Sequence, residues 1–395
     1  MKLLCIFIAF LLAFFIGQKI LVKLYYFSSR RQLFDPVDDR KIHTGSIPRT
    51  GGMAFLPTQV FIFMSVILIL RHFEVIYVDY FLLFQFMFLI MGLGILFITG
   101  IVDDLVGIFY KWKAAAQFIA ALLLPASGLW ISHLDGLLGI TFLPGWIGAP
   151  LTIFVIVLII NAFNLIDGID GLCSGLTILA CTVLGTLFFR HESWLPVIFS
   201  FITIGALSPF FYYNVFGKKE SEKHVPDKNK GLIESPESKW RIFMGDTGSM
   251  TLGLTVAFLV IRYTAGDSES TQQPNGNLLV AFSVVLVPIL DVIRIICIRL
   301  LNRKPLFLPD NNHIHHYLLK LGFSKRMALY TILLTAFGFI VFNMCISRFV
   351  TNNHNVVILL DLIIWFGGLW LLGKIRRTRP PIEAQVSIEK EQNED

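Results

Sequence analysis

The stretch FLLFQFMFLIMGLGILFITGIVDDLVGI, residues 81–108, decides the class of fold to which this chain belongs. Residues 81–102 are almost entirely apolar, and about 20 such residues suffice for a helix to cross the hydrocarbon of a bilayer. Two adjacent carboxylates, Asp103 and Asp104, follow where the apolar run stops. Because hydrocarbon excludes charged groups, acids beside a membrane span are usually functional. The stretch therefore predicts a transmembrane helix whose end belongs to an active site.

The composition of the whole chain agrees with a membrane protein. Of its 395 residues, 55% are hydrophobic and 15% are charged, whereas a soluble domain carries about 25% charged residues. The composition therefore argues against a soluble globular protein. The net charge of +6 fits basic residues that hold loops on the cytoplasmic side of a membrane. The five cysteines are scattered and form neither a disulfide framework nor a metal-binding pattern.

Apolar runs of similar length recur along the chain and predict an all-α, polytopic integral membrane protein. We expect about eleven transmembrane helices (ten or eleven), near residues 2–22, 51–70, 80–101, 114–133, 147–164, 172–190, 194–214, 249–265, 277–297, 328–348 and 355–373. The segment 134–146 is ambiguous and is compatible with a re-entrant or a surface segment.

Lysine and arginine are concentrated in alternate loops, and this asymmetry predicts the topology. The loops on one side are rich in basic residues, whereas the opposite loops hold little beyond Arg71, Arg190 and Arg348. Because basic loops remain in the cytoplasm, we expect the amino terminus outside and the carboxyl terminus in the cytoplasm.

We expect a single transmembrane domain over residues 1–377. Within it, the polar segment 217–240 predicts a flexible cytoplasmic loop, and residues 378–395 predict a disordered cytoplasmic tail.

Four clusters of ionisable residues lie beside different spans, and all fall on the basic side. They are GIVDDLVGI, NAFNLIDGIDGL, FMGDTGSM and NNHIHHYLL. Their common side predicts one shared site at the cytoplasmic face that takes a soluble substrate from the cytosol. A transporter or lipid flippase is the alternative from another class. Transporters place polar residues near the bilayer midplane on broken helices, however, whereas these acids stand at helix ends.

The first cluster combines Asp103 and Asp104 with cations downstream. Adjacent carboxylates repel one another, which raises one pKa unless they share a cation. The pair therefore indicates a proton acceptor or a divalent-metal environment, and a solvated helix end is the simpler alternative. Lys111, Lys113 and Gln117 follow closely and favour the functional interpretation, as substrate-binding residues.

The second and third clusters supply oxygen ligands. Asn164, Asp167 and Asp170 repeat every three residues and so share one broad face of a helix. Ligands of this kind suit Mg²⁺, which binds through few carboxylates plus substrate phosphates. Asp246 directly precedes an apolar run, where it could cap a helix, and we expect it also to bind the metal.

The fourth cluster holds His313, His315 and His316. A zinc site is conceivable, but no cysteine assists and adjacent histidines do not easily share one tetrahedral ion. Imidazoles that donate to a diphosphate fit better. In the first basic loop, Lys41 and His43 are candidates for contacts with phosphate, or they simply hold the topology.

Taken together, these motifs resemble the polyprenyl-phosphate N-acetylhexosamine-1-phosphate transferases, the WecA/TagO and MraY superfamily of glycosyltransferase family 4 type. The resemblance runs from RKIHTGSIPRTGG through VDDLVGIFYKWKAAAQ, NAFNLIDGIDGL and MGDTGS to PDNNHIHHYLLKLG. It covers most of the chain in the right order. The HIHH pattern is similar to the WecA/TagO branch, since the MraY branch usually shows three consecutive histidines.

The resemblance implies an enzyme of the bacterial cytoplasmic membrane with its active site on the cytoplasmic face. A UDP-linked amino sugar such as UDP-N-acetylglucosamine would donate a sugar 1-phosphate to undecaprenyl phosphate and release UMP. The product would initiate synthesis of a lipid-linked cell-surface polysaccharide. The cofactor implied is Mg²⁺, or Mn²⁺ in its place. A homodimer is compatible with the sequence, which does not decide it, and no nucleic acid is expected.

The resemblance also implies roles for individual residues. Asp103 or Asp104 matches the family's proposed base, and Asp246 with Asn164 or Asp167 matches its magnesium site. Asp170 and the three histidines match residues near the nucleotide-sugar diphosphate.

Two departures from the family pattern affect recognition of the donor sugar. The histidine motif usually follows Asp-Arg, but here Asn311 follows Asp310, and the segment 217–240 is longer than usual. An MraY-like phospho-N-acetylmuramoyl-pentapeptide transferase therefore remains the alternative enzyme. A non-catalytic scaffold of the same fold would lack one or more of the carboxylates, and none is missing.

Overall fold

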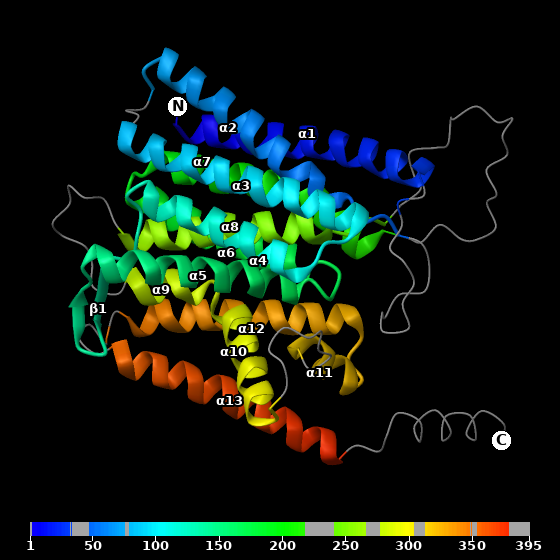
Figure 1. Ribbon diagram of the computed structural model, residues 1–395, viewed down its shortest axis with the longest axis vertical. Coiled ribbons are helices and arrows are strands. Elements are labelled where there is room, and N and C mark those ends of the chain that lie inside the picture. Colours follow the sequence, from blue (N-terminus) through cyan, green and yellow to red (C-terminus); the bar gives the residue numbers. More distant parts are fainter. Residues whose placement is uncertain are drawn as a thin grey trace, which may run out of the picture.

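A computed structural model describes residues 2–31, 33, 47–75, 79–217, 241–265, 277–303, 313–347, 349 and 354–378. Most of its helices lie roughly parallel or antiparallel in one bundle (Figure 1). The protein is an all-α polytopic membrane protein, with one short hairpin as its only sheet in the described part of the chain.

The first half of the bundle consists of long apolar helices. Its elements are α1 (Lys2–Arg31), the 3₁₀ helix η1 (Gly51–Ala54), α2 (Phe55–His72), α3 (Tyr80–Val106), α4 (Tyr110–Ala126), the strands β1 (His133–Leu137) and β2 (Ile140–Phe142), and α5 (Gly145–Ile166).

The second half contains both long and short helices. Its elements are α6 (Leu172–Arg190), α7 (Trp194–Phe216), α8 (Gly245–Ala265), α9 (Asn277–Ser283), α10 (Leu286–Leu301), α11 (Ile314–Lys320), α12 (Lys325–Ile346) and α13 (His354–Thr378).

Each of the eleven expected spans contains helix, and nine helices in the described residues are long and apolar enough to cross a membrane. The other two expected spans differ from our prediction. Helix α4 has 17 residues and ends at Ala126 rather than near residue 133. The run 277–297 is not one helix, because a turn at Val284–Val285 separates α9 from α10.

Proline explains the break between α9 and α10. Pro288 has no N–H to donate to the carbonyl of Val284, so an unbroken helix would lose that bond and meet a steric clash. Beyond the break, α10 runs across the direction of α12 instead of along it (Figure 1).

The ambiguous segment 134–146 forms most of an antiparallel hairpin and the start of α5. Strands β1 and β2 pair through His133 with Phe142 and Leu137 with Ile140. Leu138 and Gly139 both have positive φ, the backbone of a tight two-residue hairpin turn. The segment is therefore neither a re-entrant helix nor part of a span.

Helix α8 is the centre of the bundle and packs against α3, α5 and α6. Nearly all of its residues are buried, from Thr247 to Thr264. A helix that is apolar on every side belongs inside a protein rather than at its surface. The residues at the start of α8 are therefore held in place by the surrounding helices.

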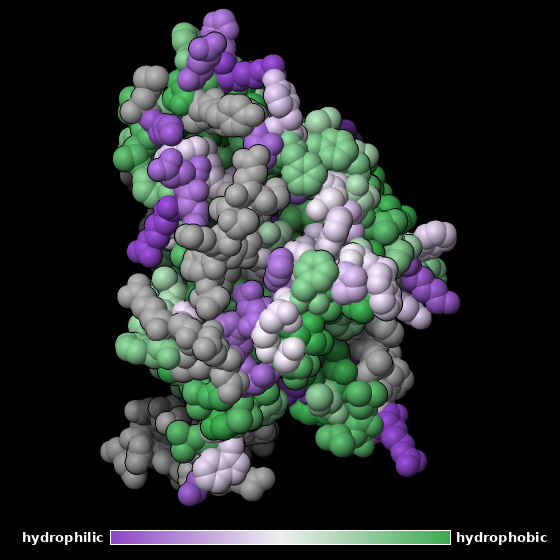
Figure 2. All heavy atoms as spheres, turned by 90° about the vertical axis from the view of Figure 1, so that its left-hand side faces the viewer, coloured by the Kyte–Doolittle hydropathy of each residue, from purple (hydrophilic) through white to green (hydrophobic). Residues whose placement is uncertain are grey.

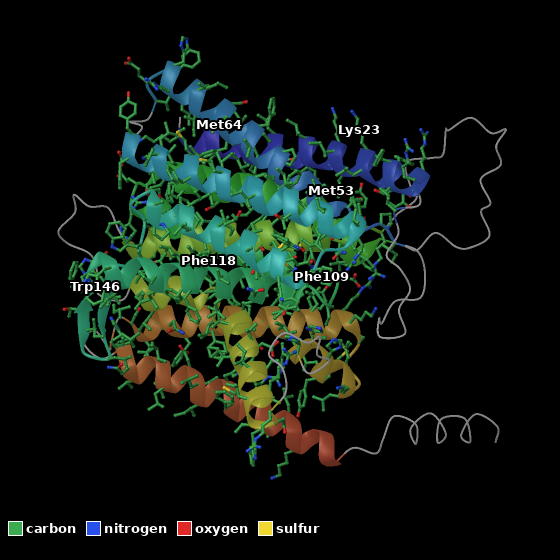
Figure 3. All side chains as sticks on the ribbon, in the orientation of Figure 1. Lys23, Met53, Met64, Phe109, Phe118 and Trp146 are labelled. Atoms are coloured by element: carbon green, nitrogen blue, oxygen red, sulfur yellow. The ribbon has the colours of Figure 1, made fainter. Side chains whose placement is uncertain are left out.

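The two ends of the bundle differ. Lys23 of α1, Met53 of η1 and Phe109, just before α4, lie toward one end, and Trp146 of α5 lies at the opposite end with the hairpin (Figure 3). Figure 2 views the hairpin end, where hydrophilic patches stand between hydrophobic sides. The other end, where α3 and α5 finish and α4, α6 and α8 begin, is called the site end below.

Candidate active site

The first acidic cluster lies where α3 ends against the start of α8. The Oδ1 atom of Asp104 accepts a hydrogen bond from the backbone N–H of Asp246 at 2.8 Å. Its Oδ2 accepts from the N–H and the hydroxyl of Thr247, at 3.0 and 2.6 Å. Asp104 thus satisfies donors at the first turn of α8 that have no partner within the helix. It acts as a cap supplied by another helix.

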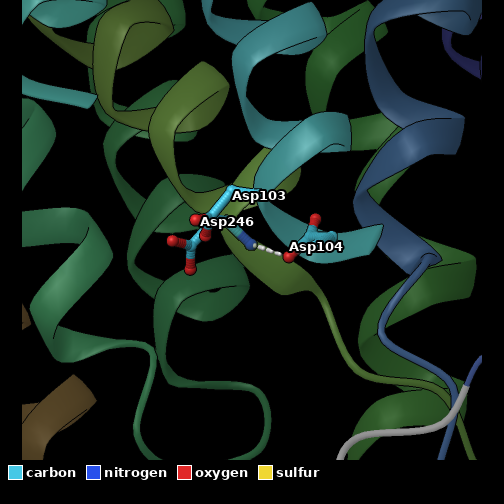
Figure 4. Close-up of side chains that lie close together, drawn as sticks. All are labelled: Asp103, Asp104 and Asp246. Atoms are coloured by element: carbon cyan, nitrogen blue, oxygen red, sulfur yellow. Dashed lines mark hydrogen bonds between the residues drawn. The ribbon is translucent and has the colours of Figure 1, made fainter. Parts of the chain in front are cut away.

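Asp103 and Asp246 face one another on the other side of this contact. Figure 4 shows their carboxylates together, with Asp104 turned away from them toward the backbone of Asp246. The Nζ atom of Lys113, in the first turn of α4, forms an ion pair with Asp103 at 2.5 Å and a second with Asp246. Lys113 therefore bridges two carboxylates that would otherwise repel each other.

Glycines allow the backbones at this point to approach so closely. A Cβ on Gly100 of α3 would stand 2.4 Å from the Cα of Thr247, and one on Gly52 would stand 2.3 Å from the nitrogen of Gly248. Gly245 has φ of +75°, which favours glycine. The glycines in RTGG and MGDTGS thus serve the packing that brings α3, η1 and α8 together.

The turn between α5 and α6 carries the second predicted set. The amide nitrogen of Asn164 donates to the hydroxyl of Ser249 in α8 at 2.9 Å. Burial, reinforced by the charges of Asp246 and Asp170, raises the pKa of the Asp167 carboxyl well above its usual range. These charges act on Asp167 because the end of α5 lies close to the start of α8. The two sets of acids belong to one site.

Asp170 lies beside a small charged cavity. It forms an ion pair with Arg241, in the segment 241–244 that leads into α8. The cavity has a volume of about 220 Å³, and Lys325 and Arg326 at the start of α12 also line it. Three cations and one carboxylate thus surround a space large enough for part of a small anionic ligand.

The histidines also reach this region. His315 is buried, and its Nε2 lies so close to Gly168 that a Cβ there would come within 2.3 Å. The rings of His313 and His315 are stacked with centroids 5.8 Å apart, and those of His315 and His316 are 4.3 Å apart. Burial, with the neighbouring imidazoles, lowers the pKa of His315 to about 3, so this ring is neutral at pH 7.

Other predicted residues stand elsewhere. Lys111 is exposed at the start of α4. Gln117 is buried one turn beyond Lys113, where its oxygen accepts from Asn161 at 2.8 Å and its nitrogen contacts the sulfur of Met250. These bonds place Gln117 between α4, α5 and α8, and its role toward substrate stays a prediction. Lys41 and His43 lie outside the described residues, as do 218–240 and 379–395.

Two charged residues at the site were missed in the sequence. Arg241 follows a polar segment rich in basic residues, and nothing in its local sequence distinguishes it from them. Asp291 of α10 accepts from the Nδ1 of His313 at 2.9 Å. It is a lone acid inside the apolar run VPILDVIRI, and an ionisable residue in such a run is itself a signal of function.

The acidic cluster fits a hard divalent cation. One oxygen each from Asp103, Asp104 and Asp246 lies within 4.8 Å of the others. The donors are oxygens, the ligands that Mg²⁺ prefers. The ammonium of Lys113 bridges the two carboxylates that face each other and offsets part of their charge. Asp167 lies nearby but does not belong to this closest group.

Comparisons with known proteins agree with this arrangement. The model of glycosyl transferase family 4 matches residues 85–264, the part of the chain that holds every acid of the cluster. A probable undecaprenyl-phosphate N-acetylglucosaminyl 1-phosphate transferase from Bacillus subtilis is 30% identical over 307 residues, which are 77% of this chain and 75% of that protein. The chain belongs to glycosyl transferase family 4.

Two further relatives carry similar names. The undecaprenyl-phosphate alpha-N-acetylglucosaminyl 1-phosphate transferase of Yersinia pestis is 27% identical over 337 residues, covering 85% of this chain and 80% of that protein. The Escherichia coli K12 protein of the same name is 28% identical over 306 residues, 77% of this chain and 74% of its own. This family 4 member thus shares most of its length with each of them.

Proposed function

We propose that this protein transfers N-acetylglucosamine 1-phosphate from UDP-N-acetylglucosamine to undecaprenyl phosphate and releases UMP. The observation that carries the proposal is the convergence of Asp103, Asp246 and Lys113, from three helices, at one end of a membrane bundle. A lipid acceptor reaches such a place from the bilayer and a nucleotide sugar reaches it from water. The names of the three relatives support the acceptor and the amino sugar.

The reaction exchanges one phosphoanhydride for another. A phosphate oxygen of the lipid attacks the β-phosphorus of the donor, and the bond from that phosphorus to the bridging oxygen breaks. The electron pair leaves with UMP. Since a phosphate monoester is largely ionised at neutral pH, no strict general base is required. Asp103, which already accepts from Lys113, serves to orient the acceptor rather than to deprotonate it.

Residues of the site would also bind the metal, stabilise the reacting phosphates and attract the nucleotide. Asp246 and Asp103, with Asn164 and Asp167 nearby, are the residues that would hold Mg²⁺, or Mn²⁺ in its place, because both oxygens of Asp104 already accept hydrogen bonds from the start of α8. Such a cation would supply neutralisation of the charge on the diphosphate, which is the chief requirement of phosphoryl transfer. Lys113 supplies a further positive charge beside the reacting groups. Arg241, Lys325 and Arg326 attract the anionic nucleotide to the cavity beside Asp170.

We infer that the site end faces the cytoplasm of a bacterium. Basic residues gather at this end, among them Arg30 and Arg31 in the last turn of α1, whereas the hairpin end holds fewer, such as Arg71 and Arg190. Positive charge of this kind marks cytoplasmic loops. The product is then a lipid-linked sugar diphosphate from which assembly of a cell-surface polysaccharide starts.

The test is a transfer assay with the purified full-length protein in detergent. We expect label from UDP-[¹⁴C]N-acetylglucosamine to appear in undecaprenyl phosphate when Mg²⁺ is present, with UMP in equal amount. EDTA should abolish the product and added Mg²⁺ should restore it. Asp103→Asn should lower kcat by about 100-fold or more, whereas Lys23→Gln, at an exposed position of α1 toward the same end of the bundle, should retain most activity.

Parallel reactions separate the alternatives. Transfer from UDP-N-acetylmuramoyl-pentapeptide but not from the amino-sugar donor would assign the protein to the MraY-like activity. Movement of labelled donor or lipid across vesicles without a lipid-linked product would indicate transport and refute the proposal.

A further inference from the structure

Asp291 connects the broken helix to the histidine segment. Its side chain is buried, with 1% of the residue exposed. Its Oδ2 accepts from Nδ1 of His313 at 2.9 Å, and its Oδ1 accepts from the backbone N–H of Ile314 at 3.0 Å and from Arg294 at 2.7 Å. One carboxylate thus accepts from a histidine ring, from the first residue of α11 and from its own helix.

The break in the helix at Val284–Val285 is what allows this contact. The turn ends α9, and α10, with Pro288 in its first turn, starts in a new direction. Asp291 stands in the second turn of α10 and contacts the segment that begins at His313. His313 is the residue that precedes α11, and its own side chain makes no capping bond. Asp291 provides that cap in its place.

A line of contacts leads from Asp291 into the site. The ring of His313 is stacked on that of His315, with an angle of 5° between the ring planes. The ring of His315 in turn lies against Gly168, next to Asp167. Because the rings are buried, a change in the orientation of His313 must alter the packing of His315 on this turn.

The hydrogen bond also decides which nitrogen of His313 carries a proton. A carboxylate accepts only, so the proton lies on Nδ1 and the Nε2 atom is left for another contact. Carboxylates that fix an imidazole in this way are common behind metal-bound and catalytic histidines, and their loss typically costs 10–100-fold in affinity or activity.

We propose that Asp291 is a positioning residue of the transferase. It holds His313 with the proton on Nδ1 and keeps the histidine segment against the turn at Asp167 and Gly168. This inference rests on the proposed function for its kinetic consequences, but not for its structural ones.

The kinetic test is a double-mutant cycle in the full-length protein. We expect Asp291→Ala to lower kcat by about 10–100-fold and to change KM for the donor by less than about threefold. If Asp291 acts through His313, the double variant Asp291→Ala/His313→Ala should be no slower than His313→Ala alone. A double variant slowed by the product of the two single effects would overturn the proposal, since independent sites add in free energy.

Asp361→Asn is the matched control. Asp361 is also a buried membrane carboxylate, bonded to Asn343 at 3.1 Å, but it belongs to the contact between α12 and α13. It should change thermal stability without changing kcat. An equal loss of kcat in Asp361→Asn would show that any buried acid matters to the fold, and would remove the specific role of Asp291.

A second measurement does not depend on activity. Nitrogen NMR of ¹⁵N-histidine-labelled protein, assigned with His313→Gln, should show a proton on Nδ1 of His313 in the wild type. Asp291→Asn should give a mixture of tautomers. A wild-type His313 without a proton on Nδ1 would overturn the proposal even if transfer is observed. The expected spectrum without transfer would leave the positioning role intact and refute only the proposed function.

Discussion

Asp104 caps α8 from another helix: its Oδ2 accepts from both the N–H and the hydroxyl of Thr247, which is 143 positions further along the chain, at 3.0 and 2.6 Å. Asp103, its neighbour in the chain, points instead to Lys113. The adjacent carboxylates of Asp103 and Asp104 therefore have different roles. One fixes the position of Asp246, and the other belongs with Asp246 to the charged centre of the site.

This division predicts that both substitutions lower activity but that only substitution of Asp104 lowers stability. Asp104→Ala leaves N–H groups of α8 without an acceptor and should lower the free energy of unfolding by about 1–2 kcal/mol, together with activity. Asp103→Asn keeps an oxygen for the N–H of Ile108, so it should abolish most activity at unchanged stability. Thermal unfolding in detergent and initial rates check both. Equal stability losses in the two variants would contradict the assignment.

Lys113 predicts a change in the dependence on metal. Lys113→Gln removes the cation shared by Asp103 and Asp246, and the pair should then bind a divalent ion more tightly. We expect the Mg²⁺ concentration at half-maximal rate to fall by about threefold, the order of effect for a partly exposed ion pair, while kcat also falls. Lys23→Gln is the control, because this lysine of α1 is exposed and has no part in the acidic cluster. A rise in the Mg²⁺ requirement would contradict the prediction.

Gly100 predicts a steric effect on the site. In Gly100→Ala the new Cβ would meet the Cα of Thr247 at 2.4 Å, so α3 and α8 would have to separate, which should cost about 1–3 kcal/mol or more. Gly94→Ala, in the same helix, meets nothing within 4 Å and should be neutral or stabilise the helix by up to about 1 kcal/mol. Melting temperatures of the two variants test this prediction. It would be wrong if Gly94→Ala were destabilised as much as Gly100→Ala.

His315 predicts loss of stability in acid. Its pKa is about 3 in the folded protein and ordinarily 6.5, so between these values the unfolded chain binds the extra proton. Its contribution to stability is therefore complete above pH 6.5 and declines as the pH falls toward 3. His315→Gln should flatten the decrease in melting temperature between pH 7 and pH 5.

Two comparisons control for other groups in this pH experiment. His316→Gln, at a less buried neighbouring position, should leave the decrease largely as in the wild type. Asp167, whose pKa is raised, contributes the opposite slope, so the variants are compared with the wild type rather than judged on absolute values. If the melting temperature of His315→Gln fell with pH as steeply as that of the wild type, the prediction that His315 is buried as an uncharged ring would be wrong.

Much of the site could be predicted from the sequence because its signals are local. A run of about 20 apolar residues predicts a span whatever surrounds it, and acids that follow such runs mark helix ends. On this basis Asp103, Asp104, Asp167 and Asp246 were expected at one face of the membrane. Oxygens of Asp103, Asp104 and Asp246 do lie within 4.8 Å of one another, and the charge of Asp246 contributes to the raised pKa of Asp167. The roles of these residues in catalysis stay a prediction.

The sequence by itself thus determined the class of protein, the positions of most helices and the chemistry of the acidic residues. Only the tertiary structure decided that Asp104 is a cap, that Lys113 bridges Asp103 and Asp246, and that Asp291 holds His313. These contacts join residues between 10 and 143 positions apart, on different helices. Local hydropathy shows which residues form a membrane helix. Which side chains meet depends on how the helices pack, because a buried polar group can bond only to groups that the packing brings within reach.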